Sequence, residues 1–515
     1  MARFKETNYD QTVMIPLSYS NQLIPGTMEY AINDIVDNYL DLSIFEKRYK
    51  NEETGAPAWY PAVMLKIILF GYSRGIISSR DLEFACRKNI IFKALSANSE
   101  PHFTSIANFV STMKNEIQPI FIKILLICSD LDLIGGEMFA IDGSKISSNA
   151  SKEWSGTFKE LENKKVKLKK KLEQLIRSHE KQDKIEEKKK VGKNKNSNDG
   201  DNDNNLTGRK RRYEKDIEKI TKFLEKNEPR KGTTGNEVKS NITDNESAKM
   251  KSSHGMIQGY NGMAVADSKN QIIIYPEAFG QGPEQPLLKP MIEGVKKMFQ
   301  QIGKGKDYLK NKKLAGDCGS YSEENLKYLS GAEIDAYIPD ERYRKRDPRF
   351  AGRGRHKPEK KQFGIENFKF IKEKNQFICP DGKIVKFYCK AKVNNSSGRK
   401  YRASPKDCKN CKLREKCLQR KTTTRRTLYV IDKYHLSNYS KAMRAKIDTP
   451  EGRKIYSRRM QIIEPVFGNI KSNKGLNKFT LRTKDKVNIQ WILYCLVHNI
   501  EKICRYGNLT VFERG

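Results

Sequence analysis

The stretch GGEMFAIDGSKISSNAS, residues 135–151, places an acidic residue directly after a short apolar segment. The apolar residues Met138–Ile141 predict a buried strand that ends in Asp142. An aspartate after a strand is most often a turn or cap residue. The role of Asp142 therefore depends on the segments downstream of it.

These downstream segments alternate between strand and helix patterns. They are a hairpin over 259–279, an amphipathic helix over 283–302, a strand ending near Asp317, a helix over 323–331 and a strand over 333–339. Parallel α/β sheets place ligand chemistry at the ends of strands, where Asp142 and Asp317 both stand. This order predicts an α/β fold with a mixed sheet and flanking helices.

The rest of the chain surrounds that sheet. The expected parts are a helical N-terminal domain over 1–135, core segments over 136–155 and 233–340, a Lys/Glu-rich helical hairpin over 156–232, a basic insertion over 341–450 and a helical C-terminal part over 451–515. Apolar residues at 3/4 spacing, leucines in the first helix and mostly isoleucine and leucine in the second, predict the two helices of the hairpin, which resembles an antiparallel coiled coil. Its polar stretch NKNSNDGDNDNN, residues 194–205, is expected to be a disordered tip.

The chain is strongly basic. Lys and Arg number 99 against 62 acidic residues, which gives a formal net charge of +37. A charge of this size is usually tolerated when the partner is a polyanion, so we expect nucleic acid. AT-rich coding, which enriches Lys and Asn, is the alternative explanation.

A third acid stands out in MQIIEPVFGNIKSNKG, residues 460–475, where Glu464 is the one acidic residue. Pro465 disfavours helical geometry at the preceding residue, so we expect a helix to start or kink at Glu464. Enzymes that cut or join phosphodiesters commonly use two divalent ions held by a few carboxylates. Asp142, Asp317 and Glu464 fit that requirement, although Glu464 could also be an ordinary helix-capping residue.

Three motifs together resemble the acidic motifs of bacterial insertion-sequence DDE transposases. They are FAIDGSKISSNAS (139–151), LAGDCGSYSEENL (314–326) and YSRRMQIIEPVFGNIK (456–471). The segment YPAVMLKIILFGYSRGIISSRDLEFACRKNIIF, residues 60–92, is also similar to the helical leader domain of the IS eleven-eighty-two group. The resemblance implies a ribonuclease-H-like core split by two insertions. It also implies a catalytic triad of Asp142, Asp317 and Glu464 that binds two Mg²⁺ or Mn²⁺ ions and cleaves transposon ends before strand transfer.

The same resemblance implies DNA-contacting residues around the third acid. The candidates are Tyr456, Arg459 and Lys471. Arg459 lies one residue farther from Glu464 than the family pattern has it, so Arg458 is an alternative. Lys471 lies two helical turns beyond Glu464, where it could hold a phosphate.

Four cysteines gather in the second insertion. Cys379 lies in FICPDGK, and Cys408, Cys411 and Cys417 lie in DCKNCKLREKC. A C-x₂-C pair with two further thiolates fits a closed structural zinc site. Cys389 could take the place of one of these ligands, and free, buried thiols are the alternative interpretation.

The expected partner is double-stranded DNA, both the terminal inverted repeats and the target. Arg353, Arg355 and Lys357 lie in a basic arm expected to contact it. We expect a homodimer on DNA, no membrane segment, and a cytoplasmic, nucleoid-associated location in a bacterium. The rival function is a non-catalytic DNA-binding protein, either an inactive transposase remnant or a zinc-dependent regulator.

Overall fold

The computed structural model falls into two compact units. One contains Met1–Gly319 and Ser457–Gly515, and the other contains Ser320–Tyr456. The residues that the structure describes are 17–49, 51, 56–190, 200–232, 235–252, 255–350, 363–393, 396–418, 420, 422–431 and 438–507. Among them, no helix has the length and apolar character needed to cross a bilayer.

The first unit begins with a group of helices. These are α1 (Met28–Asn38), α2 (Pro61–Ser73), α3 (Ser79–Lys88), α4 (Ile90–Leu95), α5 (Phe103–Ser111) and α6 (Ile117–Asp130). Pro61 begins α2, where its missing N–H costs nothing. The long helix α16 (Lys484–Tyr506) packs against this group, and the rings of Tyr72 and Tyr494 lie 5.0 Å apart. The N-terminal region is helical, as the sequence predicts.

A mixed sheet forms the centre of the first unit. Its strands are β1 (Met138–Ser147), β4 (Ala248–Ser252), β5 (Gly255–Asp267), β6 (Ile273–Phe279) and β7 (Lys313–Gly316). β5 runs antiparallel to β1, β4 and β6, while β7 runs parallel to β1 on its other side. The expected hairpin therefore consists of β5 and β6. This is the mixed α/β architecture that the sequence predicts.

The strand β1 is longer than predicted. It continues past Asp142 to Ser147 because β5 pairs with it along that whole length. Its pairing with β7, in contrast, ends at Ile141 opposite Gly316. Asp142 is therefore the first residue of β1 beyond the end of the parallel pairing, next to the point where β7 gives way to Asp317.

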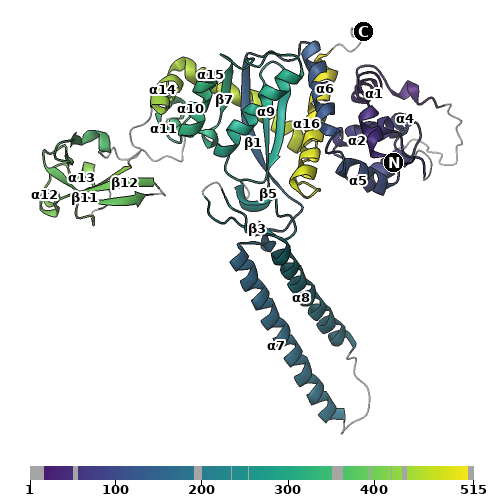
Figure 1. The fold of residues 1–515 in the computed structure, drawn as a ribbon, viewed down its shortest axis with the longest axis horizontal. Coiled ribbons are helices and arrows are strands. Elements are labelled where there is room, and N and C mark those ends of the chain that lie inside the picture. Colours follow the sequence, from purple (N-terminus) through teal and green to yellow (C-terminus); the bar gives the residue numbers. More distant parts are fainter. Residues whose placement is uncertain are drawn as a thin grey trace, which may run out of the picture. The chain divides into compact units, whose positions relative to one another are not determined.

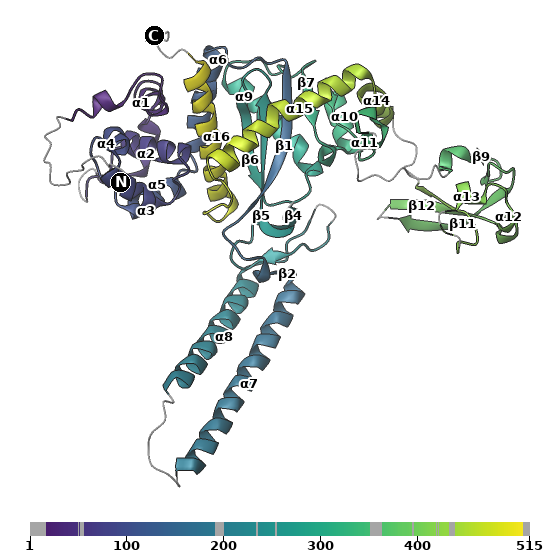
Figure 2. The same cartoon turned by 180° about the vertical axis from the view of Figure 1, so that it is seen from behind.

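Helices cover both faces of the sheet. Figure 1 shows α9 (Leu288–Gln301) over one face, and Figure 2 shows α15 (Pro450–Gly468) crossing the other beside α16. α9 approaches closely because Gly294 faces Tyr275: a Cβ on Gly294 would lie 2.2 Å from the ring. On the opposite face, the Trp491 indole N–H donates to the Met263 carbonyl at 3.0 Å.

Pro465 lies inside α15. The helix begins at Pro450 and continues through Glu464, so of the two expectations, a helix start or a kink at Glu464, the start is wrong, and the kink stays a prediction. A proline cannot donate to the carbonyl four residues earlier, here that of Gln461. The side chain of Gln271, in the turn between β5 and β6, donates to this carbonyl instead at 2.8 Å. The sheet thus supplies the donor that the helix lacks.

A helical hairpin leaves the sheet between β1 and β4. Its helices are α7 (Phe158–Lys190) and α8 (Gly200–Lys226), and the short strands β2 (Ser155–Gly156) and β3 (Ser240–Asn241) pair at its base (Figure 1). Leu161, Ile220 and Phe223 form a buried cluster there. Of the polar stretch expected to be disordered, residues 200–205 belong to α8, while 194–199 lie outside the described residues.

The second unit contains helices and a separate sheet. The helices are α10 (Glu323–Gly331), α11 (Tyr343–Arg346), α12 (Pro405–Lys409), α13 (Arg414–Cys417) and α14 (Asn438–Ile447), and β8 spans Asp335–Tyr337. The sheet is antiparallel, in the order β13 (Thr427–Ile431), β12 (Ser396–Ala403), β11 (Ile384–Val393), β10 (Gln376–Ile378) and β9 (Lys369–Ile371). Phe377, Val385, Tyr401 and Leu428 form its core. Arg353, Arg355 and Lys357 of the expected basic arm lie outside the described residues.

Candidate metal centre

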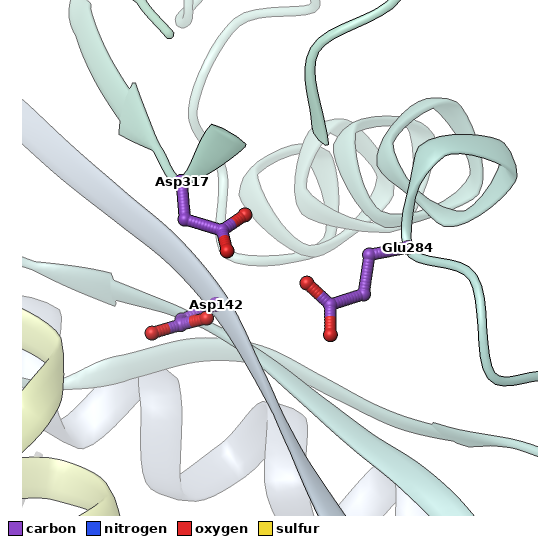
Figure 3. A group of neighbouring side chains, drawn as sticks. All are labelled: Asp142, Glu284 and Asp317. Atoms are coloured by element: carbon purple, nitrogen blue, oxygen red, sulfur yellow. The ribbon is translucent and has the colours of Figure 1, made fainter. Parts of the chain in front are cut away.

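Three carboxylates of the first unit converge at the edge of the sheet. One oxygen each of Asp142, Glu284 and Asp317 lies within 4.8 Å of the other two. Figure 3 shows the three side chains pointing toward a common space. Carboxylate oxygens are the ligands that Mg²⁺ and Mn²⁺ prefer, so this group could hold a divalent ion.

The backbone places two of these acids side by side. Asp142 lies on β1, and Asp317 directly follows β7, the parallel neighbour of β1. The N–H of Gly143 donates to an oxygen of Asp142 at 2.8 Å and fixes its orientation. The predicted proximity of Asp142 and Asp317 is thus present in the structure.

Gly319 keeps the space between the acids open. A Cβ at this position would lie 2.8 Å from Oε2 of Glu284 and 3.1 Å from Oδ1 of Asp317. Any side chain at Gly319 would therefore fill the space into which these carboxylates point. The donor set and the open space fit a small hard cation.

Glu284 was not predicted from the sequence. It precedes the 3₁₀ turn Gln285–Leu287 that leads into α9. The sequence-based helix over 283–302 gave Glu284 the appearance of an ordinary acid in a first helical turn. Its burial and its proximity to two aspartates depend on tertiary structure, and we find no local sequence signal that distinguishes it.

The environment of Glu284 favours its protonated form. Burial raises the pKa of Glu284 to about 7, and the charges of Asp317 and Asp142 act in the same direction. The opposing influences are Lys145, whose Nζ lies 3.9 Å from Oε1, and the Asn261 amide, which donates to Oε1 at 3.4 Å. These two groups do not compensate fully for the loss of water and the repulsion.

Asp142 is in a similar environment with one added cation. Burial raises the pKa of Asp142, and the nearby charge of Asp317 raises it further. Arg459 opposes this shift: its Nη1 donates to Oδ2 of Asp142 at 2.6 Å. A divalent cation between the carboxylates would relieve the same repulsion, so the electrostatics of the group favour a bound metal ion.

Glu464 is outside the group of three. Its side chain is 54% exposed, and Oε1 lies 3.6 Å from Nη2 of Arg459. Arg459 therefore lies between Glu464 and Asp142. The third acid beside the two aspartates is Glu284, whereas the sequence predicted Glu464 in that position. The role of Glu464 as a metal ligand stays a prediction.

The other residues expected near the third acid have different environments. Arg459 is 9% exposed and contacts the acidic group, whereas Arg458 is exposed. Lys471 is half-buried in the π-helical segment Asn469–Asn473, so the regular α-helical spacing from Glu464 is interrupted. Tyr456 belongs to the second unit, where its ring packs edge-on against Tyr343 at 5.2 Å. Their contacts with DNA stay predictions.

The four cysteines are neighbours in the second unit. Cys379, Cys408 and Cys417 pack against the core of the antiparallel sheet. Burial raises the pKa of Cys417; Arg426 opposes this, and Cys408, Cys411 and Cys379 add to it. No three of these four described sulfur atoms lie all within 4.8 Å of one another. The cysteines share one region but are wider apart than the carboxylates.

Two segments of the chain resemble known transposase domains. Residues 378–504 match the family described as Transposase DDE domain, and residues 18–112 match the family described as Transposase domain (DUF772). No curated protein and no solved structure matches the chain. The first match includes Arg459 and Glu464, whereas the three clustered carboxylates lie between the two matched segments. The chain is thus similar to transposases in two segments, a DDE domain and an N-terminal transposase domain.

Proposed function

We propose that the protein is a DDE-type DNA transposase of the insertion-sequence class, in the IS eleven-eighty-two group. It would cleave DNA at the transposon ends and transfer the freed 3′ ends into target DNA. The observation that carries the proposal is the convergence of Asp142, Glu284 and Asp317 on one open space, in a chain whose flanking segments match transposase domains. A DDE domain implies a ribonuclease-H-like core, and the β6-β5-β1-β7 arrangement is compatible with one.

Asp142, Asp317 and Glu284 would hold divalent ions, Mg²⁺ or Mn²⁺. Such ions, two in enzymes of this type, activate the attacking oxygen and stabilise the leaving oxygen of a phosphodiester. Asp142 is central because its carboxylate faces both Asp317 and Arg459. Glu464 is the further candidate ligand, separated from Asp142 by one guanidinium.

Arg459 would act as a positioning residue. It neutralises part of the negative charge of the carboxylate group through Asp142 and reaches Glu464 with its second nitrogen. When a cation is bound to Asp142, the guanidinium has less need to balance that carboxylate. It would then be available to a DNA phosphate, for which arginine is well suited.

The test is a set of single substitutions at constant side-chain size. Asp142→Asn, Asp317→Asn, Glu284→Gln and Glu464→Gln should each fold and bind terminal-repeat DNA. Nicking with Mg²⁺ or Mn²⁺ should fall to background for the two aspartate variants, because the ions need those charges. Mn²⁺ binding by calorimetry then decides between the glutamates. Loss of binding in Glu284→Gln but not in Glu464→Gln assigns Glu284, and the reverse result assigns Glu464.

Glu323 provides the matched control. It belongs to the second unit, where it lies at the start of α10 and accepts a hydrogen bond from Ser440 at 2.9 Å. Glu323→Gln should nick DNA like the unmodified protein. DNA binding without any metal-dependent nicking by the unmodified protein would instead indicate the non-catalytic DNA-binding protein.

We further propose that Cys379, Cys408, Cys411 and Cys417 bind one structural Zn²⁺. Cys379 lies in a tight turn in which the Lys383 N–H donates to its sulfur at 3.3 Å. Arg414 and Arg426 donate to the carbonyls of Cys408 and Cys417, at 2.7 and 2.8 Å, and anchor the other segments. Binding of zinc to thiolates would hold the four sulfurs around one ion.

The zinc proposal has a direct test. Freshly purified, reduced protein should contain close to one equivalent of zinc by elemental analysis. Cys408→Ser combined with Cys411→Ser should lose it and become sensitive to protease over residues 370–420. Cys389→Ser is the matched control, since this cysteine lies on β11 at the bulge in its pairing with β12. Metal-free wild-type protein would refute the site.

The proposed partner is double-stranded DNA, at the terminal repeats and at the target. The net charge of +37 supports this choice. Dimerisation on DNA is part of the proposal because two transposon ends must be processed together. Light scattering of the DNA-bound protein tests it.

A further inference from the structure

The sheet of the second unit has one face rich in basic and aromatic side chains. On β12, Tyr401 and Ala403 are buried in the core, whereas Lys400 and Arg402 alternate with them and point the other way. On β13, Tyr429 pairs with Lys400 in the register of the sheet. We call the face made by Lys386, Tyr388, Lys400, Arg402 and Tyr429 the aromatic-basic face.

The aromatic rings of this face are unusually open to solvent. Tyr388 is 56% exposed and Tyr429 is 48% exposed. Tyr388 occupies the extra position of a β-bulge, because the register between β11 and β12 shifts between Phe387 and Cys389. A bulge redirects a side chain out of the regular alternation. Here it places a tyrosine among the basic residues of β12.

Cations surround the two rings. The Arg402 guanidinium lies 3.6 Å from the centre of the Tyr388 ring, and the Lys400 ammonium lies 4.9 Å from that of Tyr429. Lys400 is also 6.0 Å from the centre of the Tyr388 ring. Each ring is therefore paired with a positive charge that stays partly exposed.

A hollow adjoins Tyr388. Its volume is about 590 Å³, and its wall includes Lys383, Lys386, Arg402 and Arg425. Among the described residues of that wall, Asp407 is the one acid. Four positive charges against one negative charge favour an anionic occupant.

We propose that the aromatic-basic face binds unpaired DNA. Bases would stack on Tyr388 and Tyr429, while Lys400, Arg402 and the basic wall of the hollow contact the phosphates. Open aromatic rings among cations are the usual combination for single strands, since every base offers a flat surface for stacking. In a duplex the bases stay stacked on one another, so a duplex would contact this face only through its phosphates and the basic side chains.

The choice of DNA over RNA rests on the proposed function, in which single-stranded ends arise during cleavage. The binding itself does not depend on the acidic group of the first unit. A test of binding and a test of nicking can therefore fail separately. The alternative is a protein partner that binds the exposed rings. The excess positive charge disfavours it, and one outcome of the experiment would identify it.

The experiment measures binding of a 12-nucleotide single strand by the full-length protein, without added divalent ions. Fluorescence anisotropy gives the affinity, and 2-aminopurine in the strand reports stacking through the quenching of its emission. Tyr388→Ala and Tyr429→Ala should each weaken binding at least about fivefold and reduce the quenching. Tyr388→Phe keeps a ring and should bind nearly as the unmodified protein does.

Tyr439→Ala is the matched control, since this tyrosine on α14 is 39% exposed and lies outside the face. It should leave the affinity and the quenching unchanged. Lys400→Ala with Arg402→Ala should lower the salt dependence of binding, as expected when phosphate contacts are removed. Binding of the corresponding duplex should be insensitive to both tyrosine substitutions.

Three results would overturn the proposal. The first is unchanged single-strand affinity in Tyr388→Ala and Tyr429→Ala, with folding verified by circular dichroism. The second is tighter binding of an RNA strand of the same sequence than of the DNA strand. The third is a change of oligomeric state in the tyrosine variants without a change in DNA binding, which would identify a protein interface. Nicking by the Asp142→Asn variant would count against the proposed function, whereas the binding of a single strand to the aromatic-basic face would still be decided by the tyrosine variants.

Discussion

Arg459 and Asp142 form an ion pair across 317 positions of sequence, with Nη1 and Oδ2 separated by 2.6 Å. The pair is largely buried: the side chains are 11% and 16% exposed. The guanidinium also lies near Glu464, so one cation of α15 stands between the acid of β1 and the acid of its own helix. The charge balance of the carboxylate group depends on this arginine.

Removal of Arg459 should therefore destabilise the metal-free protein. Arg459→Ala leaves Asp142 buried without its cation, and we expect a loss of about 3 kcal/mol in the free energy of unfolding. Chemical denaturation at pH 8 measures it. Arg458→Ala, an exposed neighbour, should change little. Adding Asp142→Asn to Arg459→Ala should restore part of the stability; an additive loss would show that the pair does not interact.

Glu284 should make the metal-free protein less stable as the pH rises. Because its folded pKa is raised to about 7 from 4.5, the folded state keeps a proton that the unfolded state has already released. The free energy of unfolding should then fall by up to roughly 3 kcal/mol between pH 4.5 and 7. Glu284→Gln should lack this part of the pH dependence, as measured by denaturation curves across that range.

The control for this prediction is Glu293→Gln, on the exposed side of α9, where the carboxylate pairs with Lys296. Its pH profile should follow that of the unmodified protein. If Glu284→Gln and the unmodified protein give parallel profiles, the carboxylate ionises normally and the acidic group is more open than its burial indicates.

His498 should make the protein less stable as the pH falls, in contrast to Glu284, which should make it less stable as the pH rises. Its Nε2 donates to the Gln271 carbonyl, and its Nδ1 accepts from the Asn469 amide, both at 3.0 Å, so the neutral ring fits its site. Burial lowers the pKa of His498 to about 3. The unfolded state binds a proton below pH 6.5 while the folded state does not, and stability should fall as the pH falls.

The expected loss from this histidine is roughly 2 kcal/mol between pH 6.5 and 5. His498→Gln should be less stable than the unmodified protein at pH 7, yet its stability should change less over this interval. His102→Gln, at an exposed position, is the control for histidine substitution in general. Equal slopes for the unmodified protein and His498→Gln would contradict the prediction.

The hairpin should tolerate the loss of its outer part. Leu161, Ile220 and Phe223 bury their side chains at its base, next to Trp154 and Ile242. Replacing residues 172–212 with a short Gly/Ser linker keeps that cluster and should leave the unfolding midpoint nearly unchanged. Phe223→Ala, in contrast, should cost about 3 kcal/mol. A large loss on truncation would show that the outer hairpin contributes to the fold.

Two of the three clustered acids, Asp142 and Asp317, could be predicted from local sequence. Met138–Ile141 and the residues before Asp317 have the apolar pattern of buried strands, and parallel pairing then brings their ends together. This reasoning uses only neighbours in the chain and the rules of sheets. It placed the aspartates correctly, although it ended the first strand too early.

Glu284 and the course of α15 could not be predicted in this way. The burial of Glu284 arises from chain segments far away in sequence, and its local context resembles any helix beginning. The expected helix start at Glu464 was also wrong, because the donor that compensates for Pro465 belongs to Gln271, 190 positions before the Gln461 carbonyl that accepts from it. Local rules gave the cost of a proline in a helix but could not reveal a distant side chain that offsets it.

The distance in sequence between Asp142 and Arg459 also has a consequence during synthesis. A ribosome makes the chain from its N-terminus, so the strands and all three clustered acids emerge well before α15 does. Until then the carboxylates lack their guanidinium and repel one another, which opposes the closing of this edge of the sheet. A partly made chain is thus discouraged from assembling the carboxylate group, which gains its balancing cation only late in translation.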